Sequence, residues 1–429
     1  MRFGIREGRS RSARTSTMPK LSFALPVLLF SASLAIAGNW PQILGPDRNG
    51  HAINEKLADD WSQRKPERLW TLKVGEGYAG PAIQGQRVLL FHRLGRQEVL
   101  TCVSADQGEP IWETRWSATY AGGVDSDQGP RCVPLVHQGQ VFVFGAAGEL
   151  HCASLQDGKK LWSRKLGREY KAQDGYFGAG SCPIIAADKL LVNVGGRGQA
   201  SIVAIDLASG ATLWKTFQDH ASYSSPTLRT PGNSGNDSAA VFITRLHLVG
   251  LAANDGKVLF QFPFGKTGPT VNAATPLMLD EDRVFVTASY GIGAKLLSLT
   301  GGRPKVLWES DDALSSQYPT PVLHDGHLFG IHGREDGPPA ELRCIDANTG
   351  KVSWRQAGMG MAHLIIADNK LLVAATSGEL HLLALDNSRY RELGRVKVST
   401  ATARAQPALA DGRLFVRDTD GNIAAWKLP

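Results

Sequence analysis

Short apolar strands separated by polar turns recur along most of the chain. In the fullest copy, residues 319–354, Pro321 opens an apolar strand, two further strands follow at residues 327–331 and 342–346, and a turn leads to Trp354. Apolar and polar residues alternate within these strands, and Gly, Asn and Asp mark the turns, which predicts four short antiparallel strands per unit. The unit recurs about every 40 to 50 residues, a period typical of solenoids and β-propellers.

A glycine followed four residues later by an aromatic residue ends most of these units. The pairs are Gly108 and Trp112, Gly158 and Trp162, Gly210 and Trp214, Gly256 and Phe260, and Gly350 and Trp354. Glycine supplies the turn that reverses the chain, and the aromatic side chain on the outermost strand can pack against a neighbouring sheet. Trp308 ends a further unit with looser spacing, whereas the unit near Leu364 ends without a tryptophan.

Eight units can be counted from the residues that open their first strands. These residues are Pro81, Pro134, Pro183, Pro226, Pro276, Pro321, Leu364 and Pro407. The last unit has only three strands, whereas residues 68–72 form an isolated strand near the N-terminus, and pairing the two would protect a free sheet edge. The sequence therefore predicts an all-β fold, a single eight-bladed β-propeller of four-stranded antiparallel blades closed by an N-terminal strand, with Trp70 completing the blade that contains Trp426.

The first 37 residues have the pattern of an export signal. Lys20 precedes an apolar run over residues 21–34, and residues 35–37 (Ala-Ile-Ala) form a small-x-small cleavage site. The run is too short to span a bilayer comfortably, and a buried N-terminal helix is the alternative interpretation. We therefore expect residues 1–37 to be a signal peptide, with Met18 as an alternative translation start.

Export shapes the expectations for the rest of the chain. We expect residues 38–65 to wrap along the propeller as an ordered N-terminal segment, and residues 66–429 to form the propeller itself. No later stretch is long and apolar enough to cross a membrane, and no cysteine lies near the cleavage site to accept a lipid, so we expect a soluble periplasmic or secreted protein. The leader carries six basic residues and one acidic residue, so its removal lowers the net charge from +7 to +2 and gives no case for nucleic-acid binding.

The repeat resembles that of the pyrroloquinoline-quinone-like (PQQ-like) β-propeller family, whose units end in Ala-x-Asx-Thr-Gly-x-x-x-Trp, as residues 347–354 do. The resemblance extends from Trp70 to Lys427. Residues 40–50 (WPQILGPDRNG) resemble the Trp-Pro-x-x-x-Gly-Pro-x-Arg-x-Gly opening of many exported family members. The resemblance implies the propeller scaffold, but a fold of this kind hosts unrelated functions.

The positions of the five cysteines indicate a packing role more than a metal-binding or redox role. Three share one place in the third strand of their units, where other units have small residues; the set comprises Cys102, Cys152 and Cys344, with Ala204, Gly250, Ser298 and Ala425 at the matching places. That place calls for a small buried residue. Cys132 and Cys182 begin neighbouring inner strands in an oxidising compartment, so a disulfide and two free thiols both stay open.

Family members that use the quinone as a redox cofactor carry two adjacent cysteines beside it, with calcium-binding acidic residues and a catalytic aspartate. This chain has no adjacent cysteines and no Cys-x-x-Cys-His haem attachment site. It also lacks a His-Glu-x-x-His or Gly-x-Ser-x-Gly motif. We therefore predict no cofactor, no metal site and no catalytic residue, with PQQ and calcium as the alternative.

Candidate binding residues lie in the connections between blades, which all emerge on one face. The connections from Trp112 to Pro134 and from Trp162 to Pro183 are long, and they supply Trp116, Tyr120 and Tyr176. The position three residues before the strand-opening proline supplies Tyr78, Arg131, Tyr223, Tyr318 and Arg404. If that position faces the central funnel, its aromatic and basic side chains could hold an anionic or aromatic ligand. The alternative is that they only fill the funnel mouth, and that the loop residues are solvated decoration.

These features favour a non-catalytic extracytoplasmic binding or scaffold protein that presents its loops to a protein, peptide or glycan partner. The alternative is a divergent quinone-dependent alcohol or sugar dehydrogenase with its site in the funnel. In repeat type the chain is similar to the propeller lipoprotein of outer-membrane protein assembly, although it lacks the lipid-acceptor cysteine.

Overall fold

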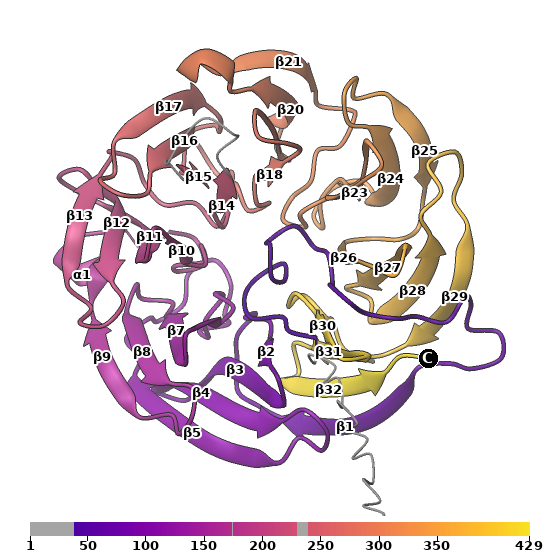
Figure 1. The fold of residues 1–429 in the computed structure, drawn as a ribbon, viewed down its shortest axis with the longest axis horizontal. Helices are drawn as coiled ribbons and strands as arrows, with labels where there is room; N and C mark the ends of the chain where they lie inside the picture. Colours follow the sequence, from indigo (N-terminus) through magenta and orange to yellow (C-terminus); the bar gives the residue numbers. More distant parts are fainter. Residues whose placement is uncertain (1–37, 174, 230–238) are drawn as a thin grey trace, which may run out of the picture. The chain divides into compact units, whose positions relative to one another are not determined.

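Eight four-stranded antiparallel sheets stand around a common axis in residues 38–173, 175–229 and 239–429, the part of the chain that the computed structural model describes (Figure 1). This arrangement confirms the predicted eight-bladed propeller. The predicted signal peptide, residues 1–37, lies outside the described residues. Across the described ranges, no helix is long and apolar enough to cross a membrane.

Blades 1 to 4 follow one another along the chain. Blade 1 contains β2 (Ala82–Gln84), β3 (Arg87–Leu94), β4 (Gln97–Ser104) and β5 (Pro110–Ser117). Blade 2 contains β6 (Leu135–His137), β7 (Gln140–Phe144), β8 (Leu150–Ser154) and β9 (Lys160–Arg164), which the helix α1 (Leu166–Glu169) follows. Blade 3 contains β10 (Ile184–Ala186), β11 (Lys189–Gly196), β12 (Ala200–Asp206) and β13 (Thr212–Thr216). Blade 4 contains β14 (Thr227–Arg229), β15 (Ala239–Ile243), β16 (His247–Ala252) and β17 (Val258–Pro263).

Blades 5 to 8 complete the ring. Blade 5 contains β18 (Leu277–Met278), β19 (Arg283–Ala288), β20 (Gly293–Ser298) and β21 (Lys305–Ser310), with the 3-10 helix η1 (Thr300–Gly302) before β21. Blade 6 contains β22 (Val322–His324), β23 (His327–His332), β24 (Glu341–Asp346) and β25 (Val352–Gln356). Blade 7 contains β26 (Ala362–Ala367), β27 (Lys370–Ala375), β28 (Glu379–Ala384) and β29 (Glu392–Lys397). Blade 8 contains β30 (Ala408–Ala410), β31 (Arg413–Arg417), β32 (Asn422–Lys427) and β1 (Glu67–Lys73).

The strand-opening prolines set where the inner strands begin. Each of the seven prolines directly precedes the first strand of its blade, because a residue without an N–H cannot donate to the ladder. Blade 7 has Leu364 at that place, and its first strand starts two residues earlier, with Ala362 paired to Ala375. The missing proline therefore lengthens the inner strand of this blade.

Tryptophans on the outer strands join each blade to the next. Nε1 of Trp112 in blade 1 donates to the carbonyl oxygen of Leu155 in blade 2 at 3.1 Å. The indole covers Gly158, where an added Cβ would lie 2.5 Å from the ring. The same two contacts recur at Trp162, Trp214 and Trp308. Since Gly158 also has a φ of +71°, the repeated glycine serves both the turn and the packing of the neighbouring indole.

The ring closes through the N-terminal strand. β1 pairs antiparallel with β32, and Trp70 lies opposite Ala425. Nε1 of Trp70 donates to the carbonyl of Ala105 in blade 1 at 2.9 Å, so the seam repeats the contact made between other blades. The buried guanidinium of Arg417 in β31 donates to the carbonyl of Ala79 at 2.8 Å and so links blade 8 to the start of blade 1. The predicted closure is confirmed.

Blade 7 receives its missing tryptophan from the N-terminal segment. Gly394 in β29 lies opposite Leu382, the place that Trp354 occupies opposite Cys344 in blade 6. Trp61, which is 2% exposed, packs on Gly394, and an added glycine Cβ would lie 2.6 Å from the Cβ of Trp61. The aromatic cover of blade 7 therefore comes from a residue more than 300 positions away in the sequence.

The repeated cysteines pack beneath the outer-strand tryptophans. Cys102 lies opposite Trp112 and is fully buried, and burial raises the pKa of its thiol to about 12. In blade 5, Leu296 rather than the predicted Ser298 stands opposite Trp308, because the turn after β20 is longer and includes η1. All five cysteines lie in the described ranges and are buried free thiols, including the pair for which a disulfide was open.

Candidate functional site

The two ends of the propeller are built differently. The top face carries the connections from the last strand of each blade to the first strand of the next. The bottom face carries the hairpin turns between the first and second strands, and the N-terminal segment, residues 38–65, runs across its centre and around blade 7 to β1 (Figure 1).

A pocket of about 240 Å³ opens in the top face. Residues from connections and hairpins around the ring line it: Tyr78, Asp125, Arg131, Phe177, Tyr223, Val271, Ala273, Tyr290, Gln317, Tyr318, Glu335 and Arg404. Because these residues come from nearly every blade, the pocket lies over the central channel. We call it the top pocket.

The position three residues before the strand-opening proline faces this pocket in most blades. Tyr78, Arg131, Tyr223, Tyr318 and Arg404 all line it. The structure therefore brings together five residues that the sequence analysis singled out from five different blade connections. That they bind a partner stays a prediction.

Arg404 is the centre of an ion-pair network in the top pocket. Its Nη2 lies 3.0 Å from Oε2 of Glu335, and its Nη1 lies 3.8 Å from Oδ2 of Asp125. The hydroxyl of Tyr318 donates to Oε1 of Glu335 at 2.9 Å. Burial lowers the pKa of Arg404, but Glu335 and Tyr78 outweigh it and the net shift is upward. Burial followed by the charge of Glu335 raises the pKa of Tyr318.

A second set of contacts joins Tyr78 to the long connection after blade 1. The Tyr78 hydroxyl donates to Oδ2 of Asp125 at 2.7 Å, and Nη1 of Arg131 lies 3.0 Å from Oδ1 of Asp127. The guanidinium groups of Arg131 and Arg404 lie 5.3 and 5.7 Å from the centre of the Tyr78 ring. Burial and then the hydrogen bond to Asp125 raise the pKa of Tyr78 to about 12.

The charges of the top pocket are satisfied within it. Burial raises the pKa of Asp125, but hydrogen bonds from Asp127 N–H and the Tyr78 hydroxyl, with the charges of Arg131 and Arg404, outweigh it and the net shift is downward. An anionic ligand would have to displace these carboxylates from their arginines. The pocket is therefore better suited to an aromatic or hydrogen-bonding group than to the anion that the sequence also allowed.

Two aromatic residues extend the top pocket toward blades 3 and 4. The hydroxyl of Tyr223 accepts a hydrogen bond from Phe177 N–H at 2.8 Å, and burial raises the pKa of Tyr223. Tyr176 is 37% exposed and donates to the carbonyl of Gly268 at 3.2 Å. A neighbouring hollow of about 350 Å³ is lined by both tyrosines. Tyr176 therefore lies beside the top pocket, in a continuous polar and aromatic surface.

The structure places Trp116 and Tyr120 away from the surface. Trp116 belongs to β5, is 7% exposed, and stacks on His151 with the ring centres 4.5 Å apart. Tyr120 is 4% exposed, and Arg131 lies 5.8 Å from its ring centre. Neither lines the top pocket among the described residues. β5 runs to Ser117, so what the sequence suggested was loop is strand, with Trp112 and Trp116 on one face.

Tyr290, Gln317 and Glu335 line the top pocket and were missed in the sequence. Tyr290 and Glu335 lie in the hairpins between the second and third strands of blades 5 and 6. These hairpins also emerge on the top face, so considering them along with the connections would have found both residues. Gln317 donates to the Tyr290 hydroxyl at 2.9 Å and accepts from Glu335 N–H at 2.8 Å, joining the two hairpins.

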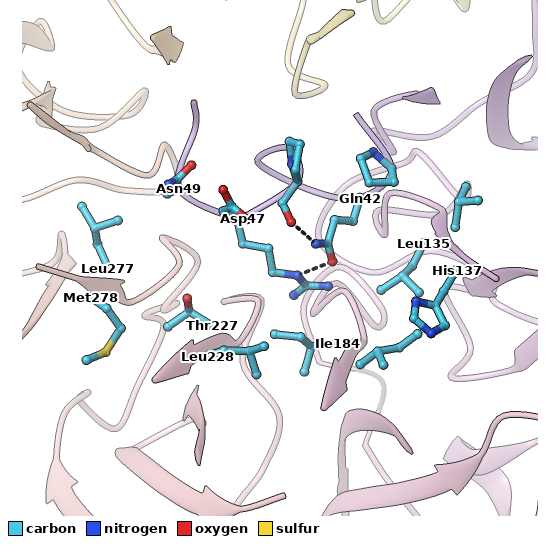
Figure 2. A pocket seen from close by; sticks show the side chains of 15 residues that line it. Gln42, Asp47, Asn49, Leu135, His137, Ile184, Thr227, Leu228, Leu277 and Met278 are labelled. Atoms are coloured by element: carbon cyan, nitrogen blue, oxygen red, sulfur yellow. Dashed lines mark hydrogen bonds between the residues drawn. The ribbon is translucent and has the colours of Figure 1, made fainter. Parts of the chain in front are cut away.

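The bottom face holds a larger pocket, of about 670 Å³, between the N-terminal segment and the inner strands. Figure 2 shows Gln42, Asp47 and Asn49 of this segment on one side of it. Mainly apolar side chains from the inner strands of blades 2 to 5 line the other side; those labelled include Leu135, His137, Ile184, Thr227, Leu228, Leu277 and Met278.

Arg48 anchors the N-terminal segment to the residues that open the inner strands of blades 3 and 4. Its side chain is almost fully buried, its Nη1 donates to the carbonyl of Pro226 at 2.9 Å, and its Nη2 donates to the carbonyl of Pro183. Its Nε donates to Oε1 of Gln42 at 2.8 Å (Figure 2). Burial lowers the pKa of Arg48 to about 10, so it stays charged at neutral pH. Glu55 fastens the segment to blade 8 by accepting hydrogen bonds from the N–H groups of Asp411 and Gly412.

The model of a protein family described as outer membrane protein assembly factor BamB matches residues 95–356 and 339–427. The chain belongs to this family. The resemblance to the PQQ-like propeller family is thereby confirmed, because the family model is one of PQQ-like repeats and its matches cover most of the ring.

Curated relatives of the same description are distant but extensive. BamB of Shewanella oneidensis is 22% identical over 385 residues, which cover 85% of this chain and 89% of that relative. BamB of Xanthomonas campestris is 26% identical over 361 residues, which cover 73% of this chain and 85% of that relative. The similarity therefore extends across the propeller and is not confined to a few repeats.

The chain shares its fold with solved structures of both kinds of propeller that the sequence suggested, a BamB and a quinone-dependent dehydrogenase. BamB from Moraxella catarrhalis matches with a TM-score of 0.60 and 15% identity, covering 85% of this chain and 98% of that chain. Quinohemoprotein alcohol dehydrogenase from Comamonas testosteroni matches with a TM-score of 0.64 and 12% identity, covering 91% and 81%. At these identities the structures establish the architecture alone.

Proposed function

We propose that this chain is a non-catalytic scaffold of outer membrane protein assembly that binds a protein or peptide partner at the top pocket. Membership of the BamB family supports the process. The observation that supports the site is the ring of tyrosines and arginines gathered from five blade connections. Tyrosine and arginine are the residues that dominate the binding energy of protein interfaces.

The geometry of the top pocket suits a partner that brings aromatic or peptide groups. Its arginines already pair with Asp125, Asp127 and Glu335, and each pair is part of a hydrogen-bonded network that holds the tyrosines in place. Preorganised side chains lose less conformational entropy on binding. The description of the relatives names protein assembly, which favours a protein over a glycan as the partner.

We propose residues 1–37 as an export signal, residues 38–65 as the segment that covers the bottom face, and residues 66–429 as the propeller. This division follows the export pattern of the sequence, the contact of Arg48 with the residue that opens β14, and the contact of Glu55 with the hairpin between β30 and β31. A periplasmic location agrees with the process that the relatives' description names.

Co-purification tests the function. Wild-type protein and a Tyr318→Ala/Arg404→Ala double variant would be immobilised and exposed to solubilised envelope proteins, with Arg229→Ala on the bottom face as the matched control. We expect components of outer membrane protein assembly to be retained by the wild type and the control, and retention to fall at least tenfold in the double variant. Equal retention by all three proteins would remove the top pocket from the account.

A titration with PQQ and calcium separates this function from a quinone-dependent dehydrogenase. The scaffold has no use for the quinone, so we expect no stoichiometric binding by calorimetry and no quinone-dependent oxidation of alcohols or sugars. Tight one-to-one binding accompanied by turnover would favour the dehydrogenase instead.

A further inference from the structure

Three ionisable side chains outside the top pocket meet between blades 1 and 2. Glu98 lies at the start of β4, Glu149 directly precedes β8, and His151 lies in β8. These residues are 1%, 5% and 5% exposed, and one donor atom of each lies within 4.8 Å of the others. One imidazole and two carboxylates form a ligand set that suits divalent transition-metal ions.

Each of these side chains has one buried atom whose hydrogen-bonding capacity is unused. Glu98 Oε2, Glu149 Oε2 and His151 Nε2 have no hydrogen-bond partner within the described ranges. Other atoms of the same side chains are engaged: Glu98 Oε1 accepts from Ala146 N–H at 2.8 Å, and His151 Nδ1 bonds to Ser163 Oγ at 2.8 Å. Buried polar atoms almost always have partners, so three such atoms in one cluster indicate a ligand that they share.

The imidazole of His151 is held in the orientation that metal coordination requires. With Nδ1–H donating to Ser163 Oγ, the lone pair of Nε2 is left for an ion. Trp116 stacks on the ring at 14° between the planes, which fixes the ring plane. The hydrogen bond and the stacking therefore fix the ring plane and the direction of Nε2, and the tautomer with Nδ1–H leaves Nε2 able to bind an ion.

Arg93 is directed away from the two carboxylates by its own hydrogen bonds. Arg93 lies opposite Glu98 in the β3–β4 ladder, but its Nη1 donates to the carbonyl of Tyr120 at 2.6 Å and its Nε to that of Gly95 at 2.7 Å. A divalent cation would neutralise both carboxylates at once.

The propeller contains an internal comparison for this cluster. Blade 7 repeats the Gly-Glu-Leu-His sequence of blade 2 at residues 378–381. At the place of Glu98, four residues before the third-strand cysteine, blade 6 has Ala340. His381 instead bonds through Nδ1 to Oε2 of Glu392 at 3.0 Å. The Nε2 of His381 lies 3.8 Å from Oε2 of Glu379 in its own blade, so both nitrogens of this histidine face carboxylates of blade 7, whereas His151 meets a carboxylate from the neighbouring blade.

We propose that Glu98, Glu149 and His151 bind a divalent transition-metal ion of the Zn²⁺ or Mn²⁺ class, which links blade 1 to blade 2. Atoms bound to one tetrahedral zinc ion at about 2.0–2.2 Å lie about 3.3–3.6 Å apart. The three ligand atoms, which lie within 4.8 Å of one another, therefore have to approach one another by up to about 1.5 Å, which rotations of the two glutamate side chains can supply. Three protein ligands leave further coordination positions for water.

Calorimetry on purified untagged protein tests the proposal. After dialysis against a chelator, the protein would be titrated with ZnCl₂ and, separately, with MnCl₂. We expect one ion of at least one of these metals per chain, and an increase of a few degrees in melting temperature at saturating metal. Glu98→Gln and Glu149→Gln keep the side-chain shape but remove a ligand charge, so each should weaken binding at least tenfold.

Glu392→Gln is the matched control, because it alters the histidine–carboxylate pair of blade 7 and should leave the isotherm unchanged. Circular dichroism establishes that each variant is folded. The proposal is overturned if the wild type gives no saturable isotherm with either metal, or if both ligand variants bind as tightly as the wild type. It is equally overturned if Glu98→Gln raises the melting temperature in chelator while the wild type binds no metal, since the two carboxylates would then share a proton.

Discussion

The bottom and the top of the propeller both place arginine side chains at the central channel, Arg48 at the bottom and Arg131 and Arg404 at the top, but in opposite environments. At the bottom, Arg48 belongs to the chain's own N-terminal segment and is buried against the carbonyls of Pro183 and Pro226. At the top, Arg404 is 38% exposed and pairs with Glu335 in an open pocket. The bottom opening is covered by a segment of the same polypeptide, whereas the top pocket is lined by blade connections and hairpins alone.

This difference separates stability from binding. A buried guanidinium that satisfies main-chain carbonyls is costly to remove, because the carbonyls are left without partners. A half-exposed ion pair contributes little to folding, and its groups are available to a partner. Substitutions at the bottom should therefore act on stability, and substitutions at the top on binding.

The largest loss of stability is expected from deleting residues 66–74. The deletion removes β1, exposes the edge of β32, and detaches Trp70 from Ala105 at the seam of the ring. The melting temperature should fall by about 10 °C or more, or the protein should fail to fold. Differential scanning calorimetry measures this, and an unchanged melting temperature would contradict closure by β1.

A smaller loss is expected where the N-terminal segment covers blade 7. Trp61→Ala should destabilise the protein by about 3–5 kcal/mol, because it removes a buried indole from Gly394. Gly394→Trp alone should also destabilise, since the new side chain would collide with Trp61. The double variant should recover part of the lost free energy of unfolding, as measured in urea. Purely additive losses would refute the idea that Trp61 takes the place of an outer-strand tryptophan in blade 7.

The two arginines test the contrast directly. Arg48→Met should cost about 2–5 kcal/mol of unfolding free energy, because two buried carbonyls lose their donors. Arg404→Met should cost less than about 1 kcal/mol, because its ion pairs are partly exposed. Both variants would be unfolded in urea, and comparable losses would mean that the top network is as structural as the bottom one.

The smallest effect is expected from Tyr78 of the top pocket at alkaline pH. The folded-state pKa of Tyr78, about 12, lies above its ordinary value of about 10. The contribution of the neutral Tyr78 hydroxyl to the free energy of unfolding is therefore complete below about pH 10 and is lost as the pH rises toward about 12. Tyr78→Phe should therefore reduce the fall in melting temperature between about pH 8 and pH 11. Tyr176→Phe is the exposed control and should leave that fall unchanged.

The fold could be predicted from the sequence because its signals are local. The prolines mark where inner strands begin, and the Gly-x-x-x-Trp spacing records a contact that recurs between blades. The isolated strand around Trp70 and the three-stranded last unit were sufficient to predict closure. Trp116 was wrongly assigned to a loop because β5 continues to Ser117, and no turn residue in the sequence marks where the strand ends.

The sites were only partly predictable because they combine residues from different blades. Alignment of the prolines found one ring of the top pocket but missed Tyr290 and Glu335, which lie in hairpins outside that register. The cluster around His151 has no sequence motif, because Glu98 comes from the neighbouring blade. The role of Trp61 depends on a chain path that local patterns do not encode.

The most direct test of the account places a photo-crosslinking amino acid at one end of the channel and then at the other. Tyr318 represents the top pocket and the 38% exposed Leu228 represents the bottom pocket. On irradiation in producing cells, the account predicts adducts with a component of outer membrane protein assembly from position 318 and none from position 228. Adducts from position 228 alone would contradict it, since the partner would then bind the end that the chain itself covers.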